Sequence, residues 1–175
     1  MRHTLVTLVE NKPGVTNRIS SLFRRRNYNI SSFTGAETEN PEISRITVVL
    51  DTDAATAALV EKNLYKLVPV LEVHDVTNER TVIRDLALVK VHATSQTRTD
   101  IMQFTEAYRG RVVDISADTL IVEISGDEDK INAFVDVMRP FGIKEMTRTG
   151  VVAMVRGNGR GLPDGLELED AAHEE

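Results

Sequence analysis

The chain has 175 residues, of which 41% are hydrophobic and 27% are charged, so it can form one ordinary domain or two small ones. No apolar run is long enough to cross a bilayer, and no charged, apolar and small-residue leader precedes the first strand-like segment, so we expect a cytoplasmic protein. The absence of cysteine excludes disulfides, thiolate catalysis and cysteine metal sites.

The net charge of −6 comes from one end of the chain. Residues Leu162–Glu175 hold six acidic side chains and no Lys or Arg, whereas the other 21 acidic residues balance 21 basic ones. Such a segment buries too little apolar surface to offset its ordering entropy, so we expect residues 157–175 to form a disordered acidic tail. The neutral remainder argues against a nucleic-acid-binding surface.

The first half of the chain alternates strand and helix patterns. A strand over His3–Val9 leads through a Pro-Gly turn into a helix whose apolar residues fall at i, i+4, i+7 and i+8. These helix residues are Val15, Ile19, Leu22 and Phe23. The patterns then predict strands over Tyr28–Thr34 and Ser44–Leu50, a helix with Asp53 as its N-cap and Leu59, Val60, Leu64 and Leu67 as its apolar side, and a strand over Val70–Val76.

The same order repeats in the second half. The patterns predict, in turn, a strand over Leu86–Val91, a helix over Thr99–Tyr108, and strands over Val112–Ile115 and Leu120–Ile124. Ser125, with Glu128 three residues later, has the spacing of a capping box at the start of the second helix. The apolar stripe of that helix is Ile131, Phe134, Val135 and Met138, and Val151–Val155 is expected to close the unit.

The two halves together predict an α+β fold made of two ferredoxin-like βαββαβ domains, each an antiparallel sheet with its helices on one face. We place the first domain at residues 1–78, the second at 79–156 and the acidic tail at 157–175. Only the first domain has a Pro-Gly turn after its opening strand. The corresponding residues 93–98 of the second domain are polar and contain neither residue, so we expect the ligand site in the first domain.

The turn at residues 10–15, Glu-Asn-Lys-Pro-Gly-Val, carries the strongest functional signal. The first N–H groups of a helix lack intrahelical partners and lie at the positive end of its dipole, so such a turn is suited to a small carboxylate. The alternative is an ordinary strand-to-helix turn with Asn11 as a cap, Pro13 fixing φ and Gly14 supplying a permissive backbone. Asn29 opens the next strand, and we expect it to converge with Asn11 at one end of the sheet.

No other motif indicates catalysis or a metal. The cations Arg24–Arg26 occupy the last turn of a helix, where the dipole alone favours them. The four histidines are isolated and have no partners at ligand spacing, namely His3, His74, His92 and His173. Because no nucleophile elbow, P-loop or His-Glu pair is visible either, we expect a sensor that is not an enzyme.

The chain closely resembles the regulatory, or small, subunit of acetohydroxyacid synthase, also called acetolactate synthase. The resemblance covers residues 1 to about 157 and rests on residues 10–15, on Arg-Asn-Tyr-Asn-Ile at 26–30 and on Ser-Arg at 44–45. Further along it includes Leu64–Val70, Leu86–Val91 and the closing Arg-Thr-Gly at 148–150. Thr-Asn at 16–17 departs from the more apolar pair of the family.

This resemblance implies that residues 1–78 form an ACT domain, which pairs side by side with its copy in a homodimer and binds valine or a related branched-chain amino acid at the shared interface. It implies effector-binding roles for Asn11, Lys12, Pro13, Gly14, Val15, Asn29 and Ile30. The implied function is to activate a catalytic large subunit and to confer feedback inhibition by valine in branched-chain amino-acid biosynthesis. The large subunit, not this chain, is then expected to carry thiamine diphosphate, magnesium and FAD and to make acetolactate from pyruvate.

We expect the N–H groups around Gly14 and Val15 to hold the ligand carboxylate, while Asn11 and Asn29 form hydrogen bonds with the amino and carboxylate groups. Apolar side chains near Val15 and Ile30 would receive the branched side chain. Three alternatives have a compatible fold: another ACT regulator such as a repressor, an acylphosphatase-like hydrolase, and an RNA-binding module. The sequence offers no helix-turn-helix for a repressor, and its candidate strands lack the aromatic residues on which RNA bases stack.

Overall fold

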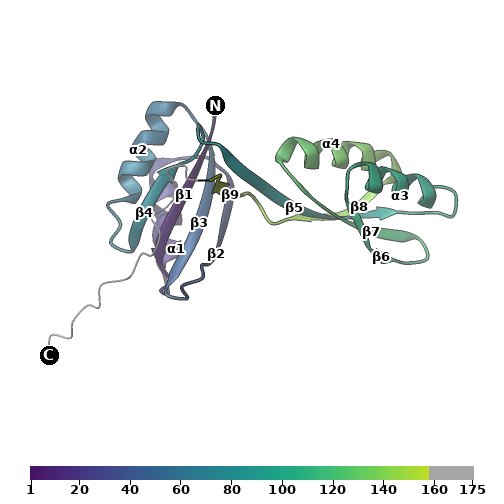
Figure 1. The fold of residues 1–175 in the computed structure, drawn as a ribbon, viewed down its shortest axis with the longest axis horizontal. Coiled ribbons are helices and arrows are strands. Elements are labelled where there is room, and N and C mark those ends of the chain that lie inside the picture. Colours follow the sequence, from purple (N-terminus) through teal and green to yellow (C-terminus); the bar gives the residue numbers. More distant parts are fainter. Residues whose placement is uncertain (158–175) are drawn as a thin grey trace. The chain divides into compact units, whose positions relative to one another are not determined.

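The computed structural model describes residues 1–157, which form two units with the same order of elements (Figure 1). The first unit comprises Met1–Val82 together with the described residues from Ala153 onward, and the second comprises Ile83–Val152. Residues 158–175, and with them nearly all of the predicted acidic tail, lie outside the described residues. In the described part of the chain, no helix is long and apolar enough to cross a membrane.

The first unit is a four-stranded antiparallel sheet with two helices on one face (Figure 1). Its elements are β1 (Arg2–Glu10), α1 (Val15–Arg26), β2 (Ile30–Glu37), β3 (Ile43–Asp51), α2 (Ala54–Leu64) and β4 (Val70–Asp75). The strand order is β2-β3-β1-β4, so β2 and β4 lie at the edges. Alternation along the strands places Leu5 of β1 and Val48 of β3 on the helix face, where they join a core with Ile19 and Phe23 of α1 and Leu64 of α2.

The other face of this sheet is also covered. Val6 of β1 and Thr47 of β3 point away from the helices, yet they are 0% and 3% exposed. The last described strand, β9 (Val152–Val155), pairs with β5 (Thr81–His92). The guanidinium of Arg45, beside Leu8 on this second face, donates to the carbonyl of Ala153 at 2.7 Å. The end of β9 therefore lies over the second face of the first sheet.

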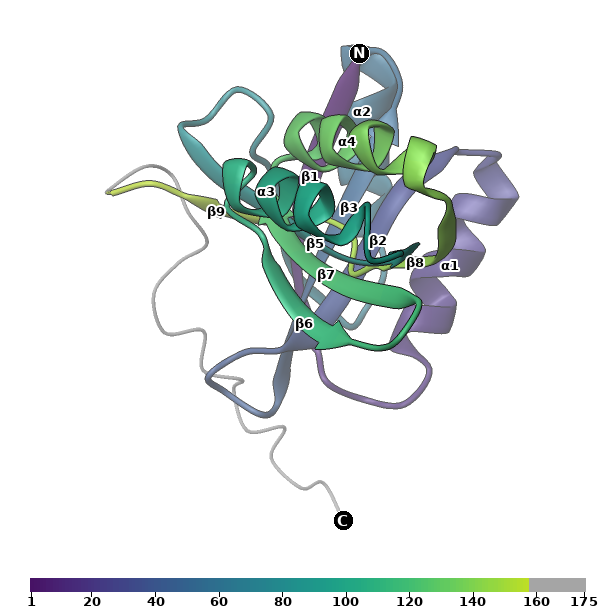
Figure 2. The ribbon, with the colours of Figure 1, turned by 90° about the vertical axis from the view of Figure 1, so that its right-hand side faces the viewer.

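The second unit repeats the arrangement, with α3 and α4 side by side over one face of its sheet (Figure 2). Besides β5, its elements are α3 (Arg98–Ala107), β6 (Arg111–Ile115), β7 (Thr119–Gly126), α4 (Glu128–Met138), a short 3-10 helix η1 (Arg139–Phe141) and β8 (Ile143–Arg148). The strand order is β6-β7-β5-β8, again antiparallel. Ile101 of α3, Phe134 of α4 and Val89 of β5 are fully buried together in its core.

The structure confirms the predicted fold class and corrects two local predictions. Ser125 does not cap α4, because it remains in β7 opposite Leu86; Asp127 is the N-cap, and its carboxylate accepts the Lys130 N–H at 2.9 Å. The sixth element of the second unit is β8, not Val151–Val155. Most of that later segment belongs to the first unit instead.

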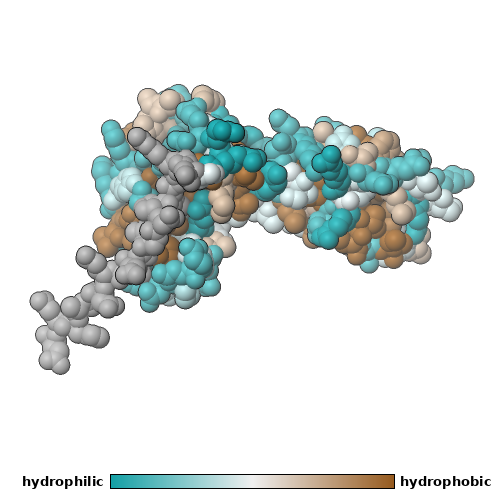
Figure 3. Space-filling model, viewed as in Figure 1, coloured by the Kyte–Doolittle hydropathy of each residue, from teal (hydrophilic) through white to brown (hydrophobic). Residues whose placement is uncertain are grey.

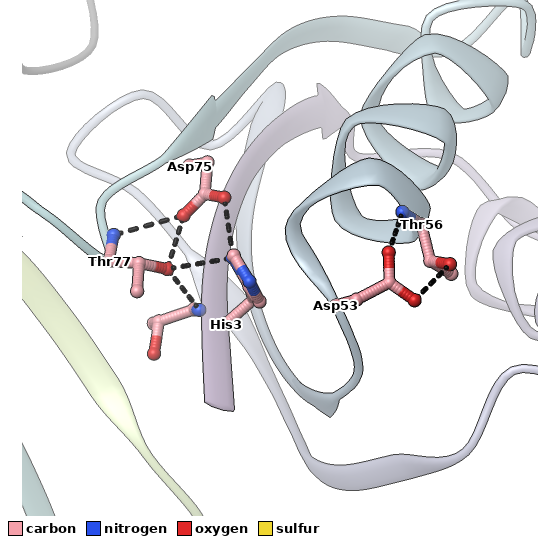
Figure 4. Close-up of polar contacts among 6 residues, drawn as sticks. His3, Asp53, Thr56, Asp75 and Thr77 are labelled. Atoms are coloured by element: carbon pink, nitrogen blue, oxygen red, sulfur yellow. Dashed lines mark hydrogen bonds and ion pairs between the residues drawn. The ribbon is translucent and has the colours of Figure 1, made fainter. Parts of the chain in front are cut away.

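A partly buried polar cluster fastens the first strand of the first unit to its last (Figure 4). The side chain of His3 in β1 is almost fully buried, and its Nδ1 lies 3.0 Å from the carboxylate of Asp75 at the end of β4. Thr77 donates to the same carboxylate through its N–H and its hydroxyl, and its hydroxyl oxygen accepts the Thr4 N–H at 2.9 Å. Burial acts to raise the pKa of Asp75, but the hydrogen bonds from Thr77 and His3 outweigh it and bring this pKa below its ordinary value.

Figure 4 also shows how α2 begins. Asp53 has extended backbone, and its carboxylate accepts the Thr56 N–H at 2.8 Å and the Thr56 hydroxyl at 3.0 Å. These bonds, the backbone one foremost, lower the pKa of Asp53. The predicted N-cap of this helix is thus confirmed: a carboxylate of the chain itself accepts a hydrogen bond from a backbone N–H in the first turn.

Candidate functional site

A pocket of about 320 Å³ lies where the predicted Pro-Gly turn meets the ends of β2 and β3. Its lining residues are Val9, Glu10, Asn11, Lys12, Val15, Thr16, Phe33, Gly35, Ala36, Glu37, Ser44 and Ile46. Val9, Val15 and Ile46 are buried and form an apolar floor, because they belong to the core cluster of the first unit. The polar groups lie around them, so the pocket combines an apolar floor with a polar rim, as small-molecule sites commonly do.

The α1 helix presents an uncapped N-terminus at this pocket. Gly14 is its N-cap residue, with φ of 86°, and it forms no side-chain cap. The first turn of α1 contains no acidic residue. The other three α-helices within residues 1–157 each have a capping or first-turn carboxylate, namely Asp53, Asp100, or Asp127 with Glu128 and Asp129. Of these described helices, α1 is thus the one with neither a capping carboxylate nor an acidic residue in its first turn.

Space is open beside Gly14. A Cβ at this position would meet no atom within 4 Å, so sterics alone do not require glycine here, but the positive φ favours it. The Val15 N–H is partly used, since it donates to the Lys12 carbonyl at 3.4 Å. At the rim, the ammonium of Lys12 lies 3.0 Å from the carboxylate of Glu10. Pro13 and Gly14 are exposed and are not among the residues that line the pocket.

Asn11 does not cap α1 but fixes the β2–β3 hairpin against the turn. Its side-chain N–H groups donate to the Glu37 carboxylate at 3.1 Å and to the Pro41 carbonyl at 2.8 Å. Its carbonyl oxygen accepts the Ser44 hydroxyl at 3.0 Å, and its backbone N–H donates to the Glu42 carbonyl at 2.7 Å. The orientation of the Asn11 amide is therefore set by its neighbours.

Asn29 and Ile30 lie at the opposite end of the sheet, and the expectation that Asn29 converges with Asn11 is wrong for a single chain. Ile30 pairs with Leu50, which in turn pairs with His3 at the beginning of β1. Glu37 pairs with Ser44 at the other end of the same strands. At about 3.3 Å per residue, the seven steps along β2 separate its two ends by about 23 Å.

Nine lining residues of the pocket were not among the effector-binding residues predicted from the sequence. Three of them, Val9, Glu10 and Thr16, adjoin the predicted turn. Phe33, Gly35, Ala36 and Glu37 come from β2, and Ser44 and Ile46 come from β3. The alternation along β2 and β3 indicates which side chains share a face, but only the strand register places the last residues of β2 beside the turn.

In the equivalent loop of the second unit, the polar side chains form hydrogen bonds with each other and with nearby backbone groups. Thr94 and Thr97 exchange hydrogen bonds, each hydroxyl accepting the N–H of the other residue, at 3.0 and 3.3 Å. The Arg98 N–H donates to the Thr94 carbonyl at 3.0 Å, and the Arg98 guanidinium donates to the Ser116 carbonyl at 2.7 Å. A separate cavity of about 680 Å³ in this unit is lined by residues of α3, β6 and the turn between them.

The alternatives of metal binding and RNA binding gain no support from the described residues. Within residues 1–157, no group of three or more His, Asp or Glu side chains is arranged to hold a metal ion. Hydrophobic surface covers β6 and β7 of the second unit (Figure 3), where Val113 and Ile115 are exposed. These side chains are aliphatic and offer no aromatic ring on which a base could stack. His173 lies outside the described residues.

Comparison with known proteins agrees with this architecture. Residues 5–72 match the "AHAS small subunit-like ACT domain", and residues 84–157 match the "Small subunit of acetolactate synthase" family. A "Probable acetolactate synthase small subunit" from Archaeoglobus fulgidus is 49% identical over 158 residues, 90% of this chain and 99% of the relative. The acetolactate synthase small subunit of Bacillus subtilis is 42% identical, covering 90% and 92% of the two chains. The crystal structure of the small subunit from Thermotoga maritima superposes with a TM-score of 0.84 at 38% identity, covering 90% and 99%.

The first unit is accordingly an ACT domain, the class of fold defined by its sheet, its two helices and the turn that opens α1. The second unit matches a family model of its own. The chain belongs to the family of acetolactate synthase small subunits. Membership of this family supports a regulatory role.

Proposed function

We propose that this chain is the regulatory subunit of acetohydroxyacid synthase, which activates the catalytic large subunit and makes it sensitive to feedback inhibition by valine or a related branched-chain amino acid. The observation that carries the proposal is the uncapped N-terminus of α1 at the pocket, in a chain of this family. A ligand carboxylate beside Gly14 would supply the anion that the other described α-helices take from their own side chains.

The pocket suggests how such a ligand is held. The carboxylate lies against the first N–H groups of α1, around Gly14 and Val15, and the branched side chain lies on the apolar floor formed by Val9, Val15 and Ile46. Lys12 lines the rim, where its ammonium is paired with the Glu10 carboxylate, and Pro13 preorganises the turn by fixing its φ. One methylene in an apolar pocket is worth about 1–3 kcal/mol, so leucine and isoleucine bind more weakly than valine rather than not at all.

The proposed homodimer explains how Asn29 and Ile30 take part in the site. β2 is an edge strand, and it carries the pocket at its Glu37 end and Ile30 at its other end. If two copies pair along β2 about a two-fold axis, the strands run antiparallel, and the first residue of one strand lies near the last residue of the other. Asn29 and Ile30 of the second copy would then complete the pocket that Asn11 and Val15 of the first copy line beside Gly14.

Feedback then follows from linkage. If valine favours one arrangement of the dimer, and the large subunit favours another, a coupling of about 1–3 kcal/mol between the two surfaces suffices for regulation. By the same linkage, the large subunit changes the affinity for valine by an equal factor. We further propose that this chain is not itself catalytic and that thiamine diphosphate, magnesium and FAD are held by the large subunit in the cytoplasm.

The direct test is to mix this chain with the purified large subunit from the same organism and to measure acetolactate formation from pyruvate with and without valine. We expect activation by the chain and a loss of that activation when valine is added. Activity that does not respond to the chain would contradict the proposed partnership, and activation that is indifferent to valine, leucine and isoleucine would contradict the effector.

Mixed dimers test the shared site. Gly14→Asp would disable the pocket of its own chain, and Asn29→Ala would remove the contribution of that chain to the other pocket. Each variant alone loses both sites of the dimer, whereas a mixture of the two recovers one intact site in each mixed dimer. Calorimetry that finds no recovery of valine binding in the mixture would exclude a site built from two copies.

A further inference from the structure

We propose that Glu37 receives the ammonium group of the amino acid bound in this pocket and so makes the site selective for α-amino acids over the α-keto acids of the same carbon skeleton. The proposal rests on the proposed function above and names a specificity residue within that site. Glu37 ends β2, lines the pocket and lies beside Asn11.

The Asn11 amide is held in one orientation by its neighbours. Both hydrogens of its NH₂ group are occupied, one by Glu37 and one by the Pro41 carbonyl. Its carbonyl oxygen takes one hydrogen bond from Ser44 and can accept another. The Asn11 side chain can therefore offer a ligand an acceptor but no further donor.

Glu37 brings a negative charge to the same part of the pocket. One carboxylate oxygen accepts from Asn11, and a carboxylate has about four acceptor positions, so acceptor capacity remains. Within the described residues, no Lys or Arg forms an ion pair with Glu37, whereas the neighbouring Glu10 is paired with Lys12. Asn11 and Glu37 together thus form a corner of the pocket that offers acceptors and a negative charge. An ammonium group, with three donors and no acceptor, is the chemical complement of that corner.

The competing interpretation is that Glu37 only fastens the hairpin through Asn11. Glu37→Gln distinguishes the two interpretations. The Gln side chain still offers an oxygen to the Asn11 N–H, but it carries no charge. Glu39→Gln is the matched control, since Glu39 is an exposed acid two residues further on that does not line the pocket.

The experiment is a calorimetric titration of the full chain and of both variants with valine and with the α-keto acid of valine. We expect wild type to bind valine at least about tenfold more tightly than the keto acid, and Glu37→Gln to lose about tenfold in valine affinity while its keto-acid affinity is unchanged. Glu39→Gln should match wild type, and thermal unfolding should show that both variants fold. A valine affinity in Glu37→Gln equal to that of wild type would overturn the ammonium role. A wild-type chain that binds no branched-chain amino acid would instead overturn the proposed function itself.

Discussion

The loop after the first strand differs between the two units, although the elements around it follow in the same order. In the first unit, Gly14 opens α1 without a side-chain cap, and a pocket lies beside it. In the second unit, Thr94 and Thr97 satisfy each other, and Asp100 supplies a carboxylate in the first turn of α3. A few residues at the start of one helix therefore decide whether its first turn has a carboxylate from the chain, and the fold alone does not.

The largest expected effect is a loss of valine affinity when Gly14, in the loop of the first unit, is substituted. Gly14→Asp should lower valine affinity at least about 1,000-fold, or about 4 kcal/mol, because its carboxylate occupies the open space beside Gly14 and repels the carboxylate of the ligand. Gly14→Asn is the matched variant, since Asn and Asp tolerate a positive φ similarly and differ in charge. We expect Gly14→Asn to lose less valine affinity than Gly14→Asp, and we expect both variants still to activate the large subunit. Unchanged valine affinity by calorimetry in the Asp variant would refute the proposed site.

The next prediction tests whether the second unit contributes to binding. Asp85 is 2% exposed and is held by the Arg148 guanidinium, with a nitrogen-to-oxygen distance of 2.7 Å. Arg148→Ala leaves a buried carboxylate without its cationic partner, although the Thr149 hydroxyl still donates to it, so the second unit should lose about 3 kcal/mol of unfolding free energy. Valine affinity at a temperature where the variant is folded should stay within about twofold of wild type. A large loss of affinity would show that the two units act together in binding.

Much of this comparison was available from the sequence. The apolar periodicity of Val15, Ile19, Leu22 and Phe23 predicted α1, and all four residues are buried. The Pro-Gly turn in one half and its absence from the other predicted which unit differs. These features are local, because a helix stripe and a tight turn depend on residues close together in the chain.

Features that depend on pairing between distant strands could not be predicted in this way. Val151–Val155 has a strand pattern whether it closes its own unit or covers another sheet, whereas the true closing strand, Ile143–Arg148, is mostly exposed and has little apolar alternation. The position of Asn29 relative to Asn11 depends on the register of β2 against β3, which the sequence leaves open. The choice of Asp127 over Ser125 follows from where β7 ends, since either side chain can cap a helix.

A smaller effect, on the free energy of unfolding, is expected when the hydrogen bonds in the loop of the second unit are removed. Thr97→Ala removes the acceptor of the Thr94 N–H, which should cost about 1 kcal/mol of unfolding free energy in the second unit. Valine binding should not change, and no second binding event should appear, because Asp100 still occupies the first turn of α3. Ser95→Ala in the same loop is the control. A second binding event in Thr97→Ala would mean that the loop of the second unit can also bind the ligand once its internal hydrogen bonds are removed.

The smallest expected effect is a pH-dependent change in stability at the cluster of His3, Asp75 and Thr77, which fastens β1 to β4 in the first unit. Because the pKa of Asp75 is lower in the folded chain than the ordinary value of about 3.9, its contribution to stability is present above that value and is lost as the pH falls through the folded pKa below it. Asp75→Asn should therefore be less stable than wild type by up to about 1 kcal/mol at pH 7, and the difference should shrink below about pH 4. Urea unfolding of both chains at several pH values measures this difference. A difference that stays constant down to pH 3 would mean that hydrogen-bond geometry, and not the charge of Asp75, holds His3 and Thr77 in place.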